Sequence, residues 1–235
     1  MLEIPNVTLC CAFTLAHELH LMAVNDCLEY IKFGDVKIFS DPEIYPNTIK
    51  IGPFTDGTAF GEFVLNDIPY KIKTSHVLFI QWDSWVIDPD MWNDKFLQYD
   101  YIGAPWWYKD NLNVGNNGFC LRSVALMRYL AENRDRFPIG QSEDQMLCRE
   151  QQKHLPQFKW APEKLASEFS FERSRPSLES RHFGFHGMFN WPFVLPPDKL
   201  AERMTLVCKS PYIKKTGMLN ELDNIFGAHW LKLRS

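Results

Sequence analysis

A polar tripeptide follows directly on a short apolar run in the middle of the chain. Residues 77–80, Val-Leu-Phe-Ile, favour a buried strand. Gln81, Trp82 and Asp83 come directly after them. In open α/β sheets, ligands bind outside the carboxyl ends of the strands. A carboxylate at that edge, with Asp88 in the loop beyond it, suits a hard divalent cation that bridges phosphates. The alternative is an aspartate that only forms the turn.

Two adjacent carboxylates stand at the expected start of a later helix, in the sequence Ser-Glu-Asp-Gln over residues 142–145. Glu143 and Asp144 lie there at the positive end of the helix dipole, which keeps a carboxylate ionised. An ionised carboxylate beside its target can act as a general base. Stabilisation of the helix alone is the other interpretation.

A glycine-containing turn and a late histidine are weaker signals. Gly115 and Gly118 enclose two asparagines, and glycine permits a close approach of the backbone to a ligand. The turn fits neither a Walker loop nor the G-x-G-x-x-G pattern, so an ordinary turn is the alternative. His186 offers an imidazole, a common metal ligand, although a lone histidine among aromatic residues usually serves the structure. The His-Glu-Leu-His run at 17–20 lacks the spacing of a zinc-protease motif and is discounted.

The elements that must position these groups alternate between strand and helix patterns. A strand over 7–14, a helix over 15–31 with one apolar face and a strand over 36–41 predict a β-α-β unit of a parallel sheet. Further elements are predicted downstream: a helix over 61–74 interrupted near Pro69, a helix over 91–99, a strand over 101–105, a helix over 123–137 with Ser123 as N-cap, a helix over 142–155 with a Ser142–Gln145 capping box, and helix-like segments near 197–205 and 216–228.

Length, charge and cysteine content set outer limits. The 235 residues suffice for one large domain with a core. The net charge of −4 provides no general attraction to nucleic acid or to an anionic membrane, so no nucleic-acid partner is expected. Six cysteines without a C-x-x-C pair indicate buried free thiols in a reduced, cytoplasmic protein. We find no signal-peptide pattern and no apolar stretch near the roughly 20 residues that span a bilayer.

The order of the motifs resembles a known family. A bacterial glycosyltransferase-like family of GT-A architecture is similar over residues 61–190, and weakly over the N-terminal β-α-β unit. Its motifs here read QWDSWVIDP, FLQYDYIGAPWW, VGNNGFCLRS, SEDQMLC, FKWAPEKLASEFSFE and FGFHG. The β-1,4-galactosyltransferases and β-1,3-N-acetylglucosaminyltransferases are similar in motif order. The resemblance implies an α/β, GT-A-like (Rossmann-like) fold with a mostly parallel central sheet flanked by helices.

We therefore expect a single domain over 1–235. It would consist of a nucleotide-binding half over 1–80, a donor and acceptor site over 81–190 and a C-terminal helical extension over 191–235.

The activity that the resemblance implies is glycosyl transfer. A sugar would move from a nucleotide-sugar, in particular a UDP-sugar, to a hydroxyl of a glycan or lipid-linked glycan acceptor in polysaccharide biosynthesis. Asp83 and His186 would hold Mn²⁺ or Mg²⁺ at the donor diphosphate, and Gln81 would face the ribose or a metal-bound water. Asp144 would be the base of an inverting single displacement, and Glu143 would bind the acceptor or donor sugar.

The resemblance assigns further residues to the ligands. The nucleotide-sugar donor would lie against two groups of residues. Its base and ribose would meet Thr14, Ser40 and Asp41 at strand ends, and its sugar would meet the glycine turn with Gly115, Asn117 and Gly118. Trp106 and Trp107 would stack on a sugar face. Two other functions stay open: a non-catalytic nucleotide-sugar or glycan-binding module, favoured by Gln81 in place of a first aspartate, and a metal-dependent nucleotide-sugar hydrolase. The basic and aromatic stretch over 208–215 suits peripheral membrane contact, and a solvated face is the alternative.

Overall fold

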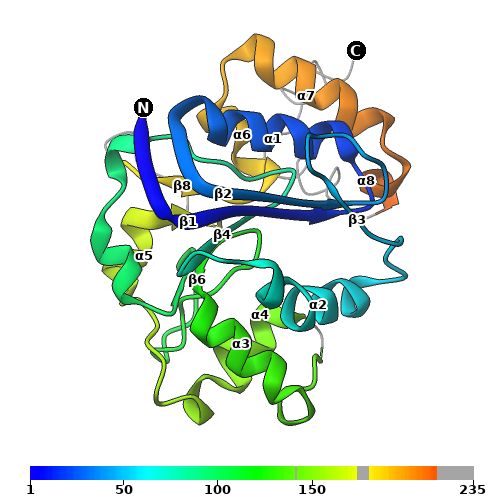
Figure 1. Cartoon of the computed structure of the whole chain (residues 1–235). Coiled ribbons are helices and arrows are strands. Elements are labelled where there is room, and N and C mark those ends of the chain that lie inside the picture. The colour runs from blue at the N-terminus through cyan, green and yellow to red at the C-terminus, as the bar shows by residue number, and fades with distance from the viewer. Residues whose placement is uncertain (141, 174–179, 216–235) are drawn as a thin grey trace.

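A central sheet with helices on both faces organises the chain (Figure 1). The computed structural model describes residues 1–140, 142–173 and 180–215. Within these residues, six strands pair in the order β3-β2-β1-β4-β6-β5. Their bounds are β1 (Leu2–Phe13), β2 (Ile31–Ser40), β3 (Ile49–Lys50), β4 (His76–Ile80), β5 (Tyr101–Ile102) and β6 (Phe119–Ser123). The first four run parallel, β6 is antiparallel to β4, and β5 is antiparallel to β6. The predicted α/β class with a mostly parallel sheet is confirmed.

The helices divide between the two faces of this sheet. The longer ones are α1 (His17–Tyr30), α2 (Gly57–Asn66), α3 (Val124–Glu132) and α7 (Pro197–Lys209), and the shorter ones are α4 (Glu143–Gln145), α5 (Glu163–Phe169), α6 (Trp191–Val194) and α8 (Pro211–Lys215). Figure 1 shows α1, α6 and α7 over one face and α2, α3 and α4 over the other. In β1, Leu9 packs into the core on the α1 and α7 side, whereas Cys10 packs into the core on the α2 and α3 side. This alternation follows from the two-residue period of a strand.

The C-terminal helices pack onto the same core as the first strand. Met204 of α7 is buried in the cluster that contains β1 and α1. Arg203 is also buried, forms an ion pair with Asp26 of α1, and places its guanidinium 4.1 Å from the centre of the Trp85 ring. A cation over an indole face is favourable, so this contact helps to hold α7 against α1.

The prediction at residue 123 is confirmed, whereas the one at residue 142 is wrong. Ser123 Oγ accepts a hydrogen bond from the Leu126 amide at 3.0 Å and caps α3. Ser142 Oγ instead donates to Asp144 Oδ1 at 2.6 Å, and the same oxygen accepts from the Gln145 amide at 2.8 Å. A short acidic side chain in a first turn competes for the local amides, which displaces the capping box.

Several other boundaries differ from the predicted ones. The predicted helix over 142–155 is α4 followed by a π-helical turn, Met146–Glu150, and a 3₁₀ turn, Gln152–His154. The predicted helix over 91–99 is replaced by two 3₁₀ turns, Pro89–Met91 and Asp94–Gln98, because Asp88 and Asn93 side chains bind the amides of Asp90 and Lys95. The interruption near Pro69 is confirmed, since α2 ends at Asn66 and a 3₁₀ turn follows. The segment 216–228 lies outside the described residues.

A small parallel pair of strands, β7 (Ser170–Phe171) and β8 (Gly184–Phe185), was not predicted. Two-residue strands carry too little pattern to be found by periodicity, and this pair joins segments far apart in the chain. Its register brings the residue that follows each strand, Glu172 and His186, next to one another.

All six cysteines, which lie within the described ranges, are free, and all but Cys208 are buried. Burial raises the pKa of the Cys27 thiol to about 12, so this thiol is inert at neutral pH. Among the helices that the structure describes, none has both the length and the apolar character to cross a bilayer.

Candidate functional site

The end of β4 carries a carboxylate that meets a distant imidazole. After Ile80 the chain turns, with the Gln81 amide donating to Ser84 Oγ at 2.8 Å. Asp83 is buried in this turn, and its Oδ1 lies 3.5 Å from His186 Nε2. Asp83 Oδ2 accepts from the Met188 amide at 3.2 Å. Oδ1 is buried without a hydrogen-bond partner among the residues that the structure describes. An unpaired buried acceptor is unfavourable, and a bound ligand would supply the missing partner.

The glycine turn lies against the same imidazole. The Gly118 carbonyl accepts hydrogen bonds from the Gln81 amide at 3.0 Å and from Ser84 Oγ at 2.5 Å. A Cβ atom built on Gly118 would lie 2.1 Å from His186 Nε2. Glycine is therefore required here by the close approach of the ring. The turn, the tip of β4 and His186 form one connected group.

Asn116 shapes this turn from within. It adopts a left-handed backbone conformation with φ of 81°. Its Oδ1 accepts from the amides of Gly118, at 2.7 Å, and Phe119, at 3.1 Å. Asparagine tolerates the left-handed region better than most residues because its side chain can bond locally. The amide group of Asn116 then faces His186, with Nδ2 2.8 Å from the ring Nδ1.

A second carboxylate faces the other side of the His186 ring. Glu172 Oε1 lies 3.1 Å from Nδ1, opposite the nitrogen that faces Asp83. Burial alone would lower the pKa of His186, but the charges of Asp83 and Glu172 outweigh it and raise that pKa to about 10. Burial also disfavours the charged form of Glu172, which by itself raises the pKa of this carboxyl. The hydrogen bond and charge of His186 more than offset this, so the pKa of Glu172 is lowered overall.

Two adjoining cavities meet at the end of β4. The smaller has a volume of ≈ 130 Å³ and is lined by Gln81, Trp82, Asp83, Glu172, Arg173, His186, Gly187, Met188, Phe189 and Tyr212. The larger has a volume of ≈ 380 Å³ and lies between the end of β1, the start of α1 and the start of α2. Its walls include Phe13, Thr14, His20, Phe54, Phe60 and Asp56. Gln81, Trp82 and Tyr212 line both, so the cavities are neighbours.

The wall of the larger cavity contains a neutral histidine on an aromatic ring. His20 stacks on Phe13 with ring centres 4.0 Å apart and an interplanar angle of 9°. Burial lowers the pKa of His20 to about 4, so the imidazole is uncharged at neutral pH. The turn before α1 passes through Ala16 at φ 53°, a conformation that alanine rarely adopts. Strained backbone of this kind gathers at binding sites.

The other residues that were predicted to contact the donor lie in different environments. Thr14 lines the larger cavity and its Oγ1 accepts from the Phe54 amide at 3.3 Å. Asp41 instead pairs with His17, with 2.7 Å between Oδ1 and Nε2. Ser40 is fully buried, and its hydroxyl is unpartnered within the described ranges. Asn117, part of the glycine turn, is half-buried and accepts a long contact from the Cys120 thiol at 3.7 Å.

The two adjacent tryptophans have different environments. Trp106 is buried and packs against Gly115, where a Cβ atom would lie 2.1 Å from the indole. Gly115 thus accommodates Trp106 in the described structure. Trp107 is 63% exposed and lies 5.1 Å, between ring centres, from Tyr108. Only the second indole offers a face to solvent.

The acidic pair at the start of α4 splits between core and surface. The Glu143 carboxylate is buried and bonded to the guanidinium of Arg122, with Oε2 3.2 Å from Nη2. That guanidinium lies between the Phe79 and Tyr101 rings, 5.0 and 5.1 Å from their centres. Glu143 therefore serves a buried ion pair. Asp144 is half-buried and holds the local bonds to Ser142 and Gln145 given above. The described linings of the two adjoining cavities include neither carboxylate.

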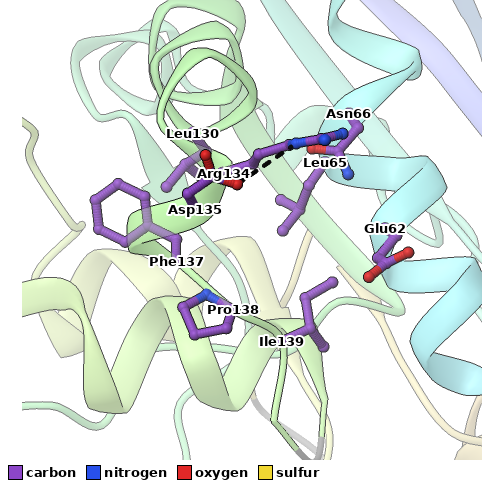
Figure 2. Close-up of a pocket in the computed structure, with 9 residues that line it drawn as sticks. All are labelled: Glu62, Leu65, Asn66, Leu130, Arg134, Asp135, Phe137, Pro138 and Ile139. Atoms are coloured by element: carbon purple, nitrogen blue, oxygen red, sulfur yellow. Dashed lines mark ion pairs between the residues drawn. The ribbon is translucent and has the colours of Figure 1, made fainter.

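A third cavity lies elsewhere. Figure 2 shows it between α2 and the segment that follows α3, with a volume of ≈ 490 Å³. Its polar rim holds Arg134 and Asp135, which form an exposed ion pair at 3.8 Å. Its described lining includes none of the predicted site residues. Exposed pairs of this kind contribute little to stability. The lining also contains Asn66, whose Oδ1 is buried without a hydrogen-bond partner among the described residues.

Several site residues were missed by sequence reasoning. These are Asn116, Glu172, His20 and Tyr212. Glu172 stands in one of the motifs of the family resemblance, directly before a basic residue, but a single glutamate has no spacing that marks it. His20 lies one turn into α1, where its polarity on a buried face was the available signal.

The comparisons with known proteins place the chain in a family. The family described as "Protein of unknown function (DUF5672)" matches residues 47–186, more than half of the chain, and the chain belongs to this family. Among curated proteins, no sequence matches.

Solved structures provide two distant likenesses. The first is the apo-form glycosyltransferase GlyE of Streptococcus pneumoniae TIGR4, with 12% identity, 76% of this chain and 53% of that chain covered, and a TM-score of 0.47. The chain thus spans about half the length of GlyE. The second is a glycosyltransferase involved in glycosylation of the major capsid of PBCV-1, with 12% identity, coverage of 68% and 81%, and a TM-score of 0.41. Both TM-scores are below 0.5, so neither likeness defines the fold or the function of this chain.

Proposed function

We propose that the chain is a glycosyltransferase that uses a nucleotide-sugar and a divalent cation. The observation that supports this best is the pair of adjoining cavities at the carboxyl ends of β1 and β4. One has aromatic walls, and the other holds a carboxylate and an imidazole. In open α/β sheets this edge is where ligands bind. A nucleotide-sugar needs both environments, one for its base and one for its diphosphate.

The larger cavity suits a nucleoside. Its volume of ≈ 380 Å³ falls within the range of about 300–1,000 Å³ that is usual for small-molecule sites. The stacked Phe13 and His20 rings, with Phe54 and Phe60, offer flat apolar walls to a base. The uncharged His20 adds a polar group without the cost of burying a charge.

The smaller cavity fits a cation that is shared with a diphosphate. Metal–ligand bonds of about 2.0–2.2 Å place two neighbouring ligands roughly 3 Å apart or slightly more. The 3.5 Å between Asp83 Oδ1 and His186 Nε2 is compatible with this, and Oδ1 is the orphaned oxygen. Among the described residues no cluster of three His, Cys, Asp or Glu side chains forms a metal cage. Phosphate oxygens and water would therefore supply the remaining ligands, as is common for Mg²⁺.

The proposed reaction is a single displacement. The acceptor oxygen bonds to the anomeric carbon, the bond from that carbon to the diphosphate oxygen breaks, and its electron pair leaves with the diphosphate. Asp144 takes the proton of the acceptor hydroxyl, and the anomeric centre inverts. A bound Mn²⁺ or Mg²⁺ supplies positive charge to the leaving diphosphate. Because Glu143 is bonded to Arg122, the role of base rests on Asp144, and the exposed Trp107 offers a stacking face to a glycan acceptor.

A non-catalytic nucleotide-sugar-binding module is the second candidate. The observation in its favour is that neither acidic residue of α4 lines the described parts of the two cavities, while Glu143 is held in the core. In this case the site would bind a nucleotide-sugar without turnover.

Calorimetric titration with UDP and UDP-sugars, with and without MnCl₂, tests the binding half of the proposal. We expect nucleotide binding that tightens at least about tenfold with Mn²⁺ in the wild type, and loss of that gain in Asp83→Asn. Asp90→Asn is the matched control, because the Asp90 side chain is 88% exposed and should leave binding unchanged. Nucleotide affinity that is identical with and without Mn²⁺ would contradict the proposal.

Release of UDP separates the alternatives. Release that rises with an added glycan acceptor indicates transfer, release without acceptor indicates hydrolysis, and binding without release indicates the module. Asp144→Asn should retain donor binding and lose transfer. If this variant transfers sugar at an undiminished rate, Asp144 is not the base.

A further inference from the structure

The geometry points to Glu172 as a positioning residue that holds the His186 ring so that Nε2 faces Asp83 and a cation bound there. This inference rests on the proposed function, because it concerns the same cation site. Glu172 would not be a ligand itself. It contacts Nδ1, whereas Asp83 faces Nε2, so the two carboxylates lie at opposite nitrogens of one ring.

The backbone places the two side chains in register. β7 and β8 pair in parallel, Ser170 with Gly184 and Phe171 with Phe185, and the residues that follow are Glu172 and His186. The His186 amide donates to the Phe171 carbonyl at 3.0 Å, which continues the pairing by one step. The contact between carboxylate and imidazole is thus built into the sheet and does not depend on a flexible loop.

A single asparagine side chain ties this backbone together. Asn190 Nδ2 donates to the Glu172 carbonyl at 2.7 Å and to the His186 carbonyl at 2.8 Å. Asn190 is 2% exposed, so these bonds are shielded from water. Both residues of the carboxylate–imidazole pair are therefore held at their main chains as well as at their side chains.

The orientation of the neighbouring Asn116 amide is also determined. Its Oδ1 accepts from two backbone amides, which leaves Nδ2 directed at His186 and Glu172. Asn116 also donates a hydrogen bond to Glu172. The Glu172 carboxylate therefore accepts hydrogen bonds from two directions, from Asn116 and from His186.

The chemical consequence concerns the tautomer of His186. A cation bound at Asp83 would take the place of the proton on Nε2, while Nδ1 keeps its proton toward Glu172. A carboxylate behind a ligating imidazole fixes the ring and raises its basicity, and loss of such a partner typically reduces metal affinity about 10- to 100-fold. This role differs from a purely structural one, which would alter stability and leave the metal–nitrogen bond unchanged.

Mn²⁺ binding tests the inference directly. Free Mn²⁺ is measured by electron paramagnetic resonance with UDP as the second ligand, and pulsed measurements detect the ¹⁴N coupling of an imidazole bound to Mn²⁺. We expect the ¹⁴N coupling in the wild type, and in Glu172→Gln a coupling that is reduced together with an affinity about 10- to 100-fold lower. Glu172→Asp keeps the charge and shortens the side chain, so its affinity should fall between the two. Glu163→Gln, a change of the same type at an exposed position of α5, is the control.

The outcomes separate the two proposals. If the wild type binds Mn²⁺ through an imidazole while both Glu172 variants match it in affinity and coupling, the positioning role is wrong and the proposed function stands. If the wild type binds no Mn²⁺ with or without UDP, the cation of the proposed function is wrong, and the inference on Glu172 is overturned with it. UDP binding in EDTA should be equal in all variants, which shows that the larger cavity is intact.

Discussion

Replacing Gly118 by alanine should displace the His186 ring and disable the cation site. The added Cβ atom would lie 2.1 Å from Nε2, 2.2 Å from Cδ2 and 2.6 Å from Cε1 of that ring. Favourable carbon contacts need about 3.5–4.0 Å, so one of the two groups must move. The backbone at residue 118 is held by three hydrogen bonds, from the Gln81 amide, from Ser84 Oγ and to Asn116 Oδ1. The imidazole is therefore the group that yields.

The size of the effect follows from the packing. Inserting a methyl group into a filled core costs about 1–3 kcal/mol. For a chain of this length, each kcal/mol lowers Tm by about 2–4 °C. A moved ring also loses its alignment with Asp83, and we expect Mn²⁺ affinity to fall at least about tenfold, as for loss of a partner that orients a ligand.

Thermal melting and Mn²⁺ titration measure the two effects. Gly52→Ala is the matched control, because a Cβ atom there meets none of the described atoms within 4 Å. The control should stay within about 0.5 kcal/mol of the wild type and bind Mn²⁺ normally. If Gly118→Ala has the same Tm as the control and binds Mn²⁺ like the wild type, the contact between the turn and His186 does not organise the site.

Three further predictions concern stability, each measured by urea unfolding. Arg122→Met leaves the Glu143 carboxylate buried without its partner and should cost about 3–5 kcal/mol; a loss below 1 kcal/mol would show that the pair is not needed. Ser123→Ala removes the cap of α3 and should cost about 1 kcal/mol, whereas no loss would indicate that water replaces the cap. The pKa of His20 is lowered from 6.5 to about 4 in the folded protein, so the unfolded chain takes up the proton first as the pH falls. The contribution of neutral His20 to the free energy of unfolding is complete above pH 6.5. It is lost as the pH falls toward 4, by at most about 3 kcal/mol. The free energy of unfolding of His20→Gln should therefore fall less between pH 7 and 4.5 than that of the wild type.

Local patterns were enough to predict most of the long elements. The apolar run at 77–80 is β4, and the three- and four-residue steps over 15–31 are α1, His17–Tyr30. The cap at Ser123 was predictable because a hydroxyl and the amides it binds are only three residues apart. Where local bonds competed, as at Ser142 and Asp144, the prediction failed, since two short polar side chains can satisfy the same first turn.

In the candidate site, too, local sequence predicted some residues and missed the contacts between distant segments. Asp83 could be identified because it is a carboxylate directly after a buried strand, at the sheet edge where ligands bind. The structure places it against His186. Glu143 and Asp144 looked equivalent in the chain, yet one of them is bonded to Arg122 in the core. Arg122 lies on a strand 21 residues earlier in the chain, so no spacing rule could connect the pair.

Sequence alone determined the alternation of strand and helix, the positions of the polar strand ends and the residue types available for chemistry, because these depend on neighbours within one or two turns. Tertiary structure decided which of those residues meet. Glu172 reaches His186 only through the register of β7 and β8, and the two cavities join only because β1 and β4 are adjacent in the sheet. The physical reason is that contacts between distant segments depend on how whole faces pack, and a single side chain carries no local record of its partner.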